Sequence, residues 1–123
     1  MFNFEKLDIY RESLALVDEV YKLTNCFPKE ELFSLTNQLR RAATSVTLNI
    51  TEGSGRSRKE FSHFLNMART SCYECIAILE ISKRRNYIHL SDHQNLYSKI
   101  TSLVKMINGL RTYLNESSMN HEQ

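Results

Sequence analysis

Apolar residues recur every three or four positions along four stretches of this 123-residue chain. This spacing predicts amphipathic helices over about residues 5–25, 28–52, 58–85 and 91–114. No stretch alternates apolar and polar residues over the length of a strand, so no sheet is expected. Four helices of roughly 20 residues joined by short connections predict an all-α fold, an antiparallel up-down four-helix bundle.

The chain has few turn-forming residues, and they fall between the predicted helices. Turns are expected near Phe27, from Gly53 to Arg56, and from Asn86 to Leu90. Pro28 suits the first turn of the second helix, where its missing N–H costs nothing. Gly53 and Gly55 are expected to end that helix, because glycine adopts left-handed backbone angles without steric cost.

Two capping boxes are predicted to open the third and fourth helices. Ser57 and Glu60 have the spacing of a capping box, in which the side chain of each residue bonds the backbone N–H of the other. The third helix should therefore begin at Arg58. The segment from Ser91 to Gln94 has the same form and should open the fourth helix. One domain is expected over residues 1–115, with a flexible polar tail over 116–123.

The first helix carries more apolar surface than one packing seam needs. Its main stripe and a second, neighbouring flank are both apolar; the stripe is Leu7, Tyr10, Leu14, Val17 and Tyr21, and the flank is Ile9, Leu16, Val20 and Leu23. A sector this wide indicates a second helix-packing surface, hence self-association. The alternative is one broad face buried inside a single bundle, and the sequence leaves both open.

Charge is distributed unevenly along the chain. Residues 1–39 carry four Lys/Arg and seven Asp/Glu, a net charge of −3, whereas residues 40–85 carry nine against four, a net +5. This distribution is compatible with an anionic partner. No signal peptide and no apolar run of about 20 residues is present, so we expect a cytoplasmic protein that does not cross a membrane.

The sequence offers little for catalysis or metal binding. Cys72 and Cys75 form a C-x-x-C in the middle of a helix, on its apolar face, so they are expected to be core thiols. His89 and His93 have the spacing of a metal pair, but the predicted helix start separates them. The segment Glu52–Gly55 lacks the preceding strand of a phosphate-binding loop. No metal and no cofactor is therefore predicted.

A polar stripe along the second helix allows a structural or a catalytic interpretation. The stripe is Arg41, Ser45, Asn49 and Glu52, and it should meet Arg69 or Glu74 of the third helix. Glu52 or Glu74 as a catalytic carboxylate is the less favoured interpretation, because no histidine, serine–base pair or metal cluster accompanies either. A hydrogen-bonded network that sets helix register, or a subunit contact, is favoured.

Several segments together identify a resemblance. "QLRRAA", "NITEGSGR" and "EFSHFLNMAR" are the most specific parts of a similarity that spans nearly the whole chain. The chain resembles the four-helix bundle family of proteins encoded in intervening sequences of bacterial large-subunit (23S) ribosomal RNA genes. It departs from the family pattern at Thr47, where proline is common, and at Thr51, where alanine is common; the missing proline predicts a straighter second helix.

The resemblance implies a homopentameric ring with no established enzymatic activity. It also implies kinship with the accessory proteins of diversity-generating retroelements, which associate with a reverse transcriptase and with nucleic acid. We therefore expect a non-enzymatic oligomer that binds RNA or DNA phosphates without strong sequence preference; the alternative is a protein–protein adaptor, for example a reverse transcriptase subunit. The predicted contact residues are Arg40, Arg41, Arg56, Arg58, Lys59 and Arg69. No aromatic residue lies from Arg56 to Lys59, which argues against single-strand stacking there.

Overall fold

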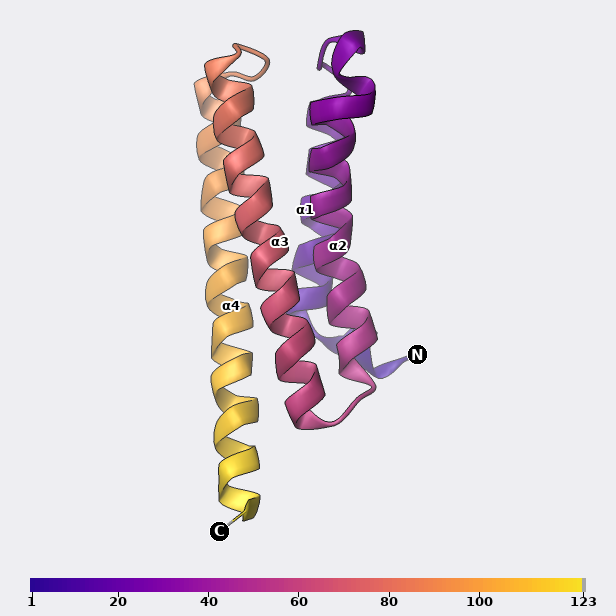
Figure 1. Ribbon diagram of the computed structural model, residues 1–123, viewed down its shortest axis with the longest axis vertical. Helices are drawn as coiled ribbons and strands as arrows, with labels where there is room; N and C mark the ends of the chain where they lie inside the picture. Colours follow the sequence, from indigo (N-terminus) through magenta and orange to yellow (C-terminus); the bar gives the residue numbers. More distant parts are fainter. Residues whose placement is uncertain (123) are drawn as a thin grey trace.

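The computed structural model describes residues 1–122, with side chains described through residue 116. Within this range the chain is helical and contains no strand, which confirms the all-α prediction. The four long helices are α1 (Asp8–Thr24), α2 (Asn37–Ser54), α3 (Arg58–Arg84) and α4 (Leu90–Glu122). Figure 1 shows them side by side, each running opposite to the one before it.

Contacts between the helices agree with this antiparallel course. Thr47 of α2 donates a hydrogen bond to Ser13 near the start of α1 at 2.9 Å, and the guanidinium of Arg40, earlier in α2, reaches Thr24 at the end of α1 at 2.8 Å. α2 and α3 share the most extensive contact. Lys99 of α4 forms an ion pair with Glu19 of α1, which closes the bundle.

The connection between α1 and α2 differs from the prediction. Pro28 precedes a 3₁₀ turn, Lys29–Glu31, and a wide π turn, Leu32–Thr36, so regular α2 begins only at Asn37. Ser34 has non-helical backbone angles (φ −125°, ψ −105°), which mark a kink. From Asn37 onwards α2 continues without interruption through Thr47, whose hydroxyl lies in the buried contact with α1.

The connection between α2 and α3 corrects the role assigned to the glycines. Neither Gly53 nor Gly55 has a positive φ; Gly53 lies inside α2 and Gly55 follows the helix with φ −91°. A Cβ on Gly53 would lie 2.6 Å from Cβ of Phe64 in α3. Gly53 is therefore needed for the close approach of two helices. The residue with a left-handed backbone is Asn86 (φ 63°), in the turn between α3 and α4.

The two predicted capping boxes have different outcomes. For the first, α3 begins at Arg58 as predicted, and the Ser57 hydroxyl accepts a hydrogen bond from the Glu60 backbone N–H at 3.2 Å. The Glu60 carboxylate accepts a hydrogen bond from the Ser57 hydroxyl at 3.0 Å, so the two side chains bond each other and the cap is confirmed in its Ser57 half. The second is wrong, because α4 begins at Leu90 and Ser91 already lies within its first turn. α4 continues past the predicted domain boundary at residue 115 as far as Glu122. Flexibility over 116–123 stays a prediction, and Gln123 lies outside the described residues.

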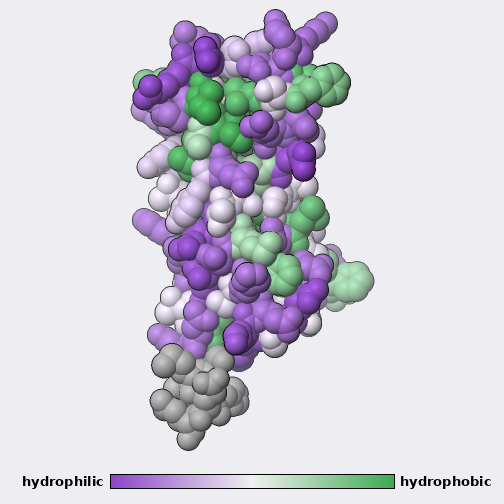
Figure 2. Space-filling model, in the orientation of Figure 1, coloured by the Kyte–Doolittle hydropathy of each residue, from purple (hydrophilic) through white to green (hydrophobic). Residues whose placement is uncertain are grey.

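The buried face of α1 is the second apolar flank, and not the stripe that the sequence predicts as the main packing face. Ile9, Leu16 and Val20 are buried in the core, whereas Leu14 and Tyr21 of the predicted stripe are exposed. The remainder of the stripe and Leu23 pack at the edge of the core. On the face drawn in Figure 2, hydrophilic side chains cover most of the surface and apolar ones gather toward the upper end. Among the described residues, no helix is long and apolar enough to span a membrane.

Candidate nucleic-acid interface

The six predicted contact residues occupy three separate parts of the bundle. Arg40 and Arg41 lie on α2, Arg69 lies on α3, and the remaining three lie around the turn from α2 to α3. Their environments also differ, because four of the six guanidinium or ammonium groups are in contact with carboxylates or aromatic rings within the chain. The six residues therefore do not share one environment.

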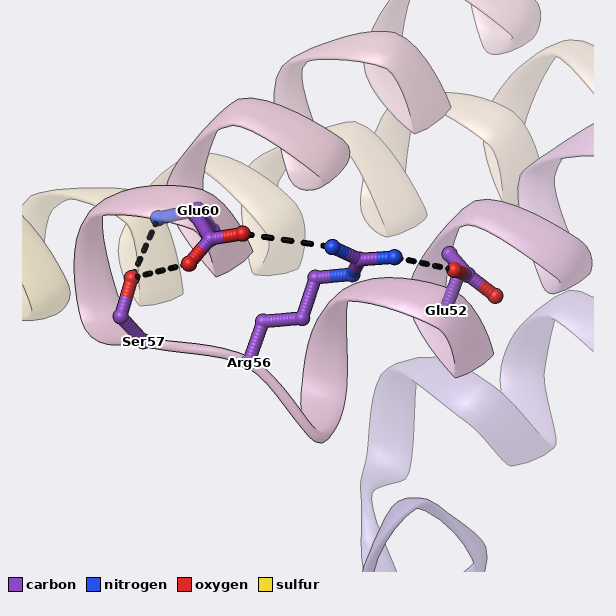
Figure 3. A network of polar contacts seen from close by, with 4 residues as sticks. All are labelled: Glu52, Arg56, Ser57 and Glu60. Carbon is purple, nitrogen blue, oxygen red and sulfur yellow. Dashed lines mark hydrogen bonds and ion pairs between the residues drawn. The ribbon is translucent and has the colours of Figure 1, made fainter.

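Arg56 bridges the two helices that flank the turn (Figure 3). Its guanidinium lies 2.6 Å from a Glu52 carboxylate oxygen and 3.3 Å from one of Glu60. Hydrogen bonds to these carboxylates raise the pKa of Arg56, and hydrogen bonds from Ser57 and then Arg56 lower the pKa of Glu60. Two carboxylates thus balance the charge of Arg56, whose role here is to hold the turn.

Arg58 and Lys59 are the more available cations at this turn. Both are exposed in the first turn of α3, where unpaired backbone N–H groups and the helix dipole also favour an anion. The Arg58 guanidinium lies 5.4 Å from the ring centroid of Tyr113 in α4. Neither residue forms an ion pair within the described part of the chain, so both keep their donors for a ligand.

Neighbouring residues Arg40 and Arg41 have different surroundings. The half-buried Arg40 donates to Thr24 at 2.8 Å and to Asn25 at 3.2 Å, and its guanidinium covers the ring of Tyr21 at 4.6 Å. These contacts join the start of α2 to the end of α1. Arg41 is exposed and makes no hydrogen bond or ion pair among the described side chains. Arg41 is therefore available to a partner, whereas Arg40 has a structural role.

Arg69 lies on α3 and does not reach the polar stripe of α2. Its guanidinium donates to Asn66 at 2.7 Å and lies 5.7 Å from the ring centroid of Tyr73, both on α3 itself. The stripe instead meets α3 through Ser71, whose hydroxyl donates to Ser45 at 3.0 Å. The expected contact between the helices exists, but the residue that makes it is neither Arg69 nor Glu74.

Part of the stripe lies in a small polar groove between α2 and α3. Asn49 donates to the backbone carbonyl of Ser45 at 2.9 Å, which positions the amide along α2. Arg41, Ser45, Ser71 and Glu74 line this groove between α2 and α3, which has a volume of about 320 Å³. Among the described residues no hydrogen bond joins the Glu74 carboxylate to either hydroxyl, whereas the bond between Ser71 and Ser45 links the two helices and helps to set their register.

Cys72 and Cys75 lie in the core, whereas His89 and His93 lie nearer the surface. Cys72 and Cys75 are buried, and burial raises the pKa of each thiol to about 12, so neither forms a thiolate near neutral pH. His93 lies 3.6 Å from a carboxylate oxygen of Glu80, whereas His89 precedes α4 and is exposed. Within the described residues no three potential metal ligands come together.

The structure shows contacts between arginines and aromatic rings that were not predicted from the sequence. Four arginines lie against aromatic rings: Arg40 on Tyr21, Arg56 on Phe64, Arg58 on Tyr113 and Arg69 on Tyr73. Three of the four rings belong to a different helix or lie beyond the turn, so a search of the basic segment alone does not find them. The pair on α3 has a sequence signal, because residues four apart in a helix are neighbours.

Comparisons with known proteins agree with this fold. Residues 5–109 match the family described as "23S rRNA-intervening sequence protein". No curated protein matches the chain. A crystal structure of a protein of unknown function from the S23 ribosomal protein family of Bacteroides thetaiotaomicron superposes with a TM-score of 0.78. It is 24% identical and covers 85% of this chain and 95% of its own, so it supports the fold. The family match spans most of the chain, which therefore belongs to the 23S rRNA-intervening sequence protein family.

Proposed function

We propose that this protein is a non-enzymatic, self-associating bundle that binds nucleic-acid phosphates through exposed cations on α2 and at the start of α3. The observation that carries the proposal is that Arg41, Arg58 and Lys59 are exposed and make no ion pair among the described residues, in the part of the chain with a net charge of +5. Phosphate contacts give affinity without reading bases, so we expect little sequence preference. A cytoplasmic location belongs to the same proposal.

Self-association would multiply this weak surface. Leu14 and Tyr21 of α1 and Leu48 of α2 are 39%, 45% and 61% exposed. The hydrogen bond between Ser13 and Thr47 brings together the turns of α1 and α2 that carry Leu14 and Leu48, and Tyr21 and Leu48 line the same groove. We take these three exposed side chains as the apolar patch for self-association. A ring such as the pentamer implied by the resemblance needs this patch to meet a different face of the next copy. Several copies of the cations would then act together.

Binding is tested with labelled structured RNA and duplex DNA at two salt concentrations. The variant Arg41→Gln/Arg58→Gln/Lys59→Gln should bind both ligands more weakly, and its logarithmic salt dependence should fall by about 0.7–0.9 for each phosphate that it no longer neutralises. The matched control Lys6→Gln/Lys22→Gln/Lys29→Gln removes the same charge from exposed positions in the acidic first third. Equally weakened binding in both variants would show a bulk charge effect and refute this surface.

The apolar patch is tested by light scattering. Leu14→Gln/Leu48→Gln should lower the mass toward the 14.4 kDa of one chain, because it removes the exposed apolar area on both helices. Leu90→Gln changes a leucine that is 60% exposed at the start of α4, outside the patch, and should leave the mass unchanged. A wild-type protein that is monomeric at micromolar concentration would refute self-association.

A protein–protein adaptor is the second candidate, and one exposed side chain favours it. Phe33 is 92% exposed and lies beside the kink at Ser34, with Leu32 also exposed. Exposed aromatic residues are common anchors of protein interfaces. A wild-type protein that binds neither RNA nor DNA at low salt, but binds a protein partner such as a reverse transcriptase through Phe33, would favour this function.

A further inference from the structure

The groove between α3 and α4 does not include Arg41, Arg58 or Lys59 in its lining, so it is distinct from the cation surface on α2 and at the start of α3. We propose that it binds single-stranded nucleic acid, with a base stacked against Tyr73 and Tyr97 and adjacent phosphates held by Arg69 and Lys105. This inference rests on the proposed function, because it names the class of nucleic acid and adds a second contact surface. It also revises the expectation, drawn from the segment Arg56–Lys59 alone, that the protein lacks a stacking platform.

The shape and lining of the groove suit a flat aromatic ligand. Tyr73 lies on α3 and Tyr97 on α4, both line the groove, and each is 51% exposed. Between them the groove is lined by apolar side chains, including the buried Ile100 and the half-buried Ile76 and Val104. Its volume is about 330 Å³, within the range of about 300–1,000 Å³ typical of small-molecule sites.

One cation, Lys105, lines the groove, and a second, Arg69, lies beside the Tyr73 ring on α3. Arg69 precedes Tyr73 by one helical turn, and Lys105 follows Tyr97 by two. Because α3 and α4 run in opposite directions, both displacements point the same way along the groove. Neither cation forms an ion pair with any described residue, and Arg69 uses one of its donors on Asn66. An anion at this end therefore meets two uncompensated positive charges.

Among the described residues no carboxylate lines this groove, which distinguishes it from two of the other three grooves of the bundle. Glu74 lines the groove between α2 and α3, and Glu19 and Asp92 line the one between α1 and α4. The groove between α1 and α2 is lined by one aromatic ring, Tyr21, so its lining offers no second ring for a base to stack on. In the part of the chain that the structure describes, the lining of the groove between α3 and α4 alone combines two exposed rings with a cation and no carboxylate; the Glu80 carboxylate lies outside this lining, 3.6 Å from His93.

The arrangement of rings and charges favours a single strand over a duplex. Bases in a duplex are already stacked on one another, whereas a single strand can present the face of a base to an aromatic side chain. The Tyr97 ring is also held in position, since His93 stacks on it with ring centroids 6.1 Å apart. Stacking tolerates any base, so this groove, like the phosphate contacts, should show little sequence preference.

The test is fluorescence anisotropy with three labelled probes of equal length: a ten-nucleotide oligouridylate, an abasic decamer and a ten-base-pair duplex. Wild type should bind the oligouridylate more tightly than the abasic decamer, because only the former has bases to stack. Tyr73→Ala and Tyr97→Ala should each weaken oligouridylate binding about 5- to 150-fold and leave duplex binding and the salt dependence unchanged. Lys105→Gln should instead reduce the logarithmic salt slope by about 0.7.

The controls separate stacking from loss of fold. Tyr73→Phe and Tyr97→Phe keep the rings and should bind as wild type. Phe33→Ala removes a ring that is 92% exposed and lies outside both the groove lining and the cation surface, so it should have no effect on oligouridylate binding. Circular dichroism should show unchanged helix content in every variant, since Tyr73 and Tyr97 are half exposed.

Three results would overturn the inference, and they differ in what else they affect. If the Tyr→Ala variants bind oligouridylate as wild type while the cation variant on α2 and α3 loses duplex binding, the proposed function stands and this inference is wrong. If wild type binds none of the probes, both are wrong. If the Tyr→Ala variants lose self-association in light scattering and not oligouridylate binding, the groove is a contact between copies.

Discussion

Replacing Gly53 with alanine tests how closely α2 and α3 approach each other. Gly53 is buried in the last turn of α2, and a Cβ there would lie 2.6 Å from Cβ of Phe64 and 2.9 Å from Cδ1 of Phe61. The ring of Phe61 can rotate away, but the Cβ of Phe64 is fixed to the backbone of α3. The two helices, which share the most extensive contact of any pair in the bundle, must therefore move apart at this point.

The change in the free energy of unfolding expected for Gly53→Ala is the sum of two opposing effects. Alanine in a helix is favoured over glycine by about 1 kcal/mol, and overpacking a core costs about 1–3 kcal/mol. Because the fixed Phe64 Cβ places the overpacking cost at the upper end, we expect Gly53→Ala to lower the free energy of unfolding by about 1–2 kcal/mol. Urea denaturation followed by circular dichroism, at one fixed protein concentration, measures this difference.

A second glycine provides a control variant that should change the free energy of unfolding in the opposite direction. Gly109 lies inside α4, and a Cβ there would meet no atom within 4 Å. Gly109→Ala should therefore raise the free energy of unfolding by up to about 1 kcal/mol, the helix propensity gain alone. A Gly53→Ala variant that is as stable as Gly109→Ala would refute the close packing of α2 on α3.

Further predictions concern the helix cap and the thiols. Ser57→Ala removes the acceptor of the Glu60 backbone N–H and should lower the free energy of unfolding by about 0.5–2 kcal/mol in urea denaturation; an unchanged value would contradict the capping box. The pKa of Glu60 is lowered in the folded protein, so its contribution to stability should be present above its unfolded pKa and lost as the pH falls through the folded value; Glu60→Gln, compared with wild type across this range, should show a flatter pH dependence. Cys72→Ala/Cys75→Ala should lower the free energy of unfolding by roughly 1–3 kcal/mol and leave binding intact, and stoichiometric zinc in the wild-type protein would contradict this structural role. In the native protein only the exposed Cys26 should react with a thiol reagent near pH 8, and modification of all three cysteines under native conditions would contradict the burial of the other two.

The candidate interface could be predicted from the sequence only in part. The excess of cations over residues 40–85 was visible, and Arg41, Arg58 and Lys59 are exposed as the proposal requires. Glu52 and Glu60, four residues on either side of Arg56, were also visible, but a salt bridge across a turn depends on how the chain bends there. The grouping of Tyr73 with Tyr97 needs the pairing of α3 with α4, which no local pattern contains.

The sequence by itself determined the number of helices, the absence of strands from residues 1–122, and the start of α3 at Arg58, because periodicity and capping are local effects. Only the tertiary structure decided which face of α1 is buried. Because the apolar sector of α1 is wider than one packing seam, the helix could turn either of two apolar faces toward the core. The contacts with α2 and α4 decide which face is buried. These contacts bury Ile9, Leu16 and Val20 and leave Leu14 and Tyr21 exposed. The same holds for Gly53, whose missing side chain matters only because α3 lies against it.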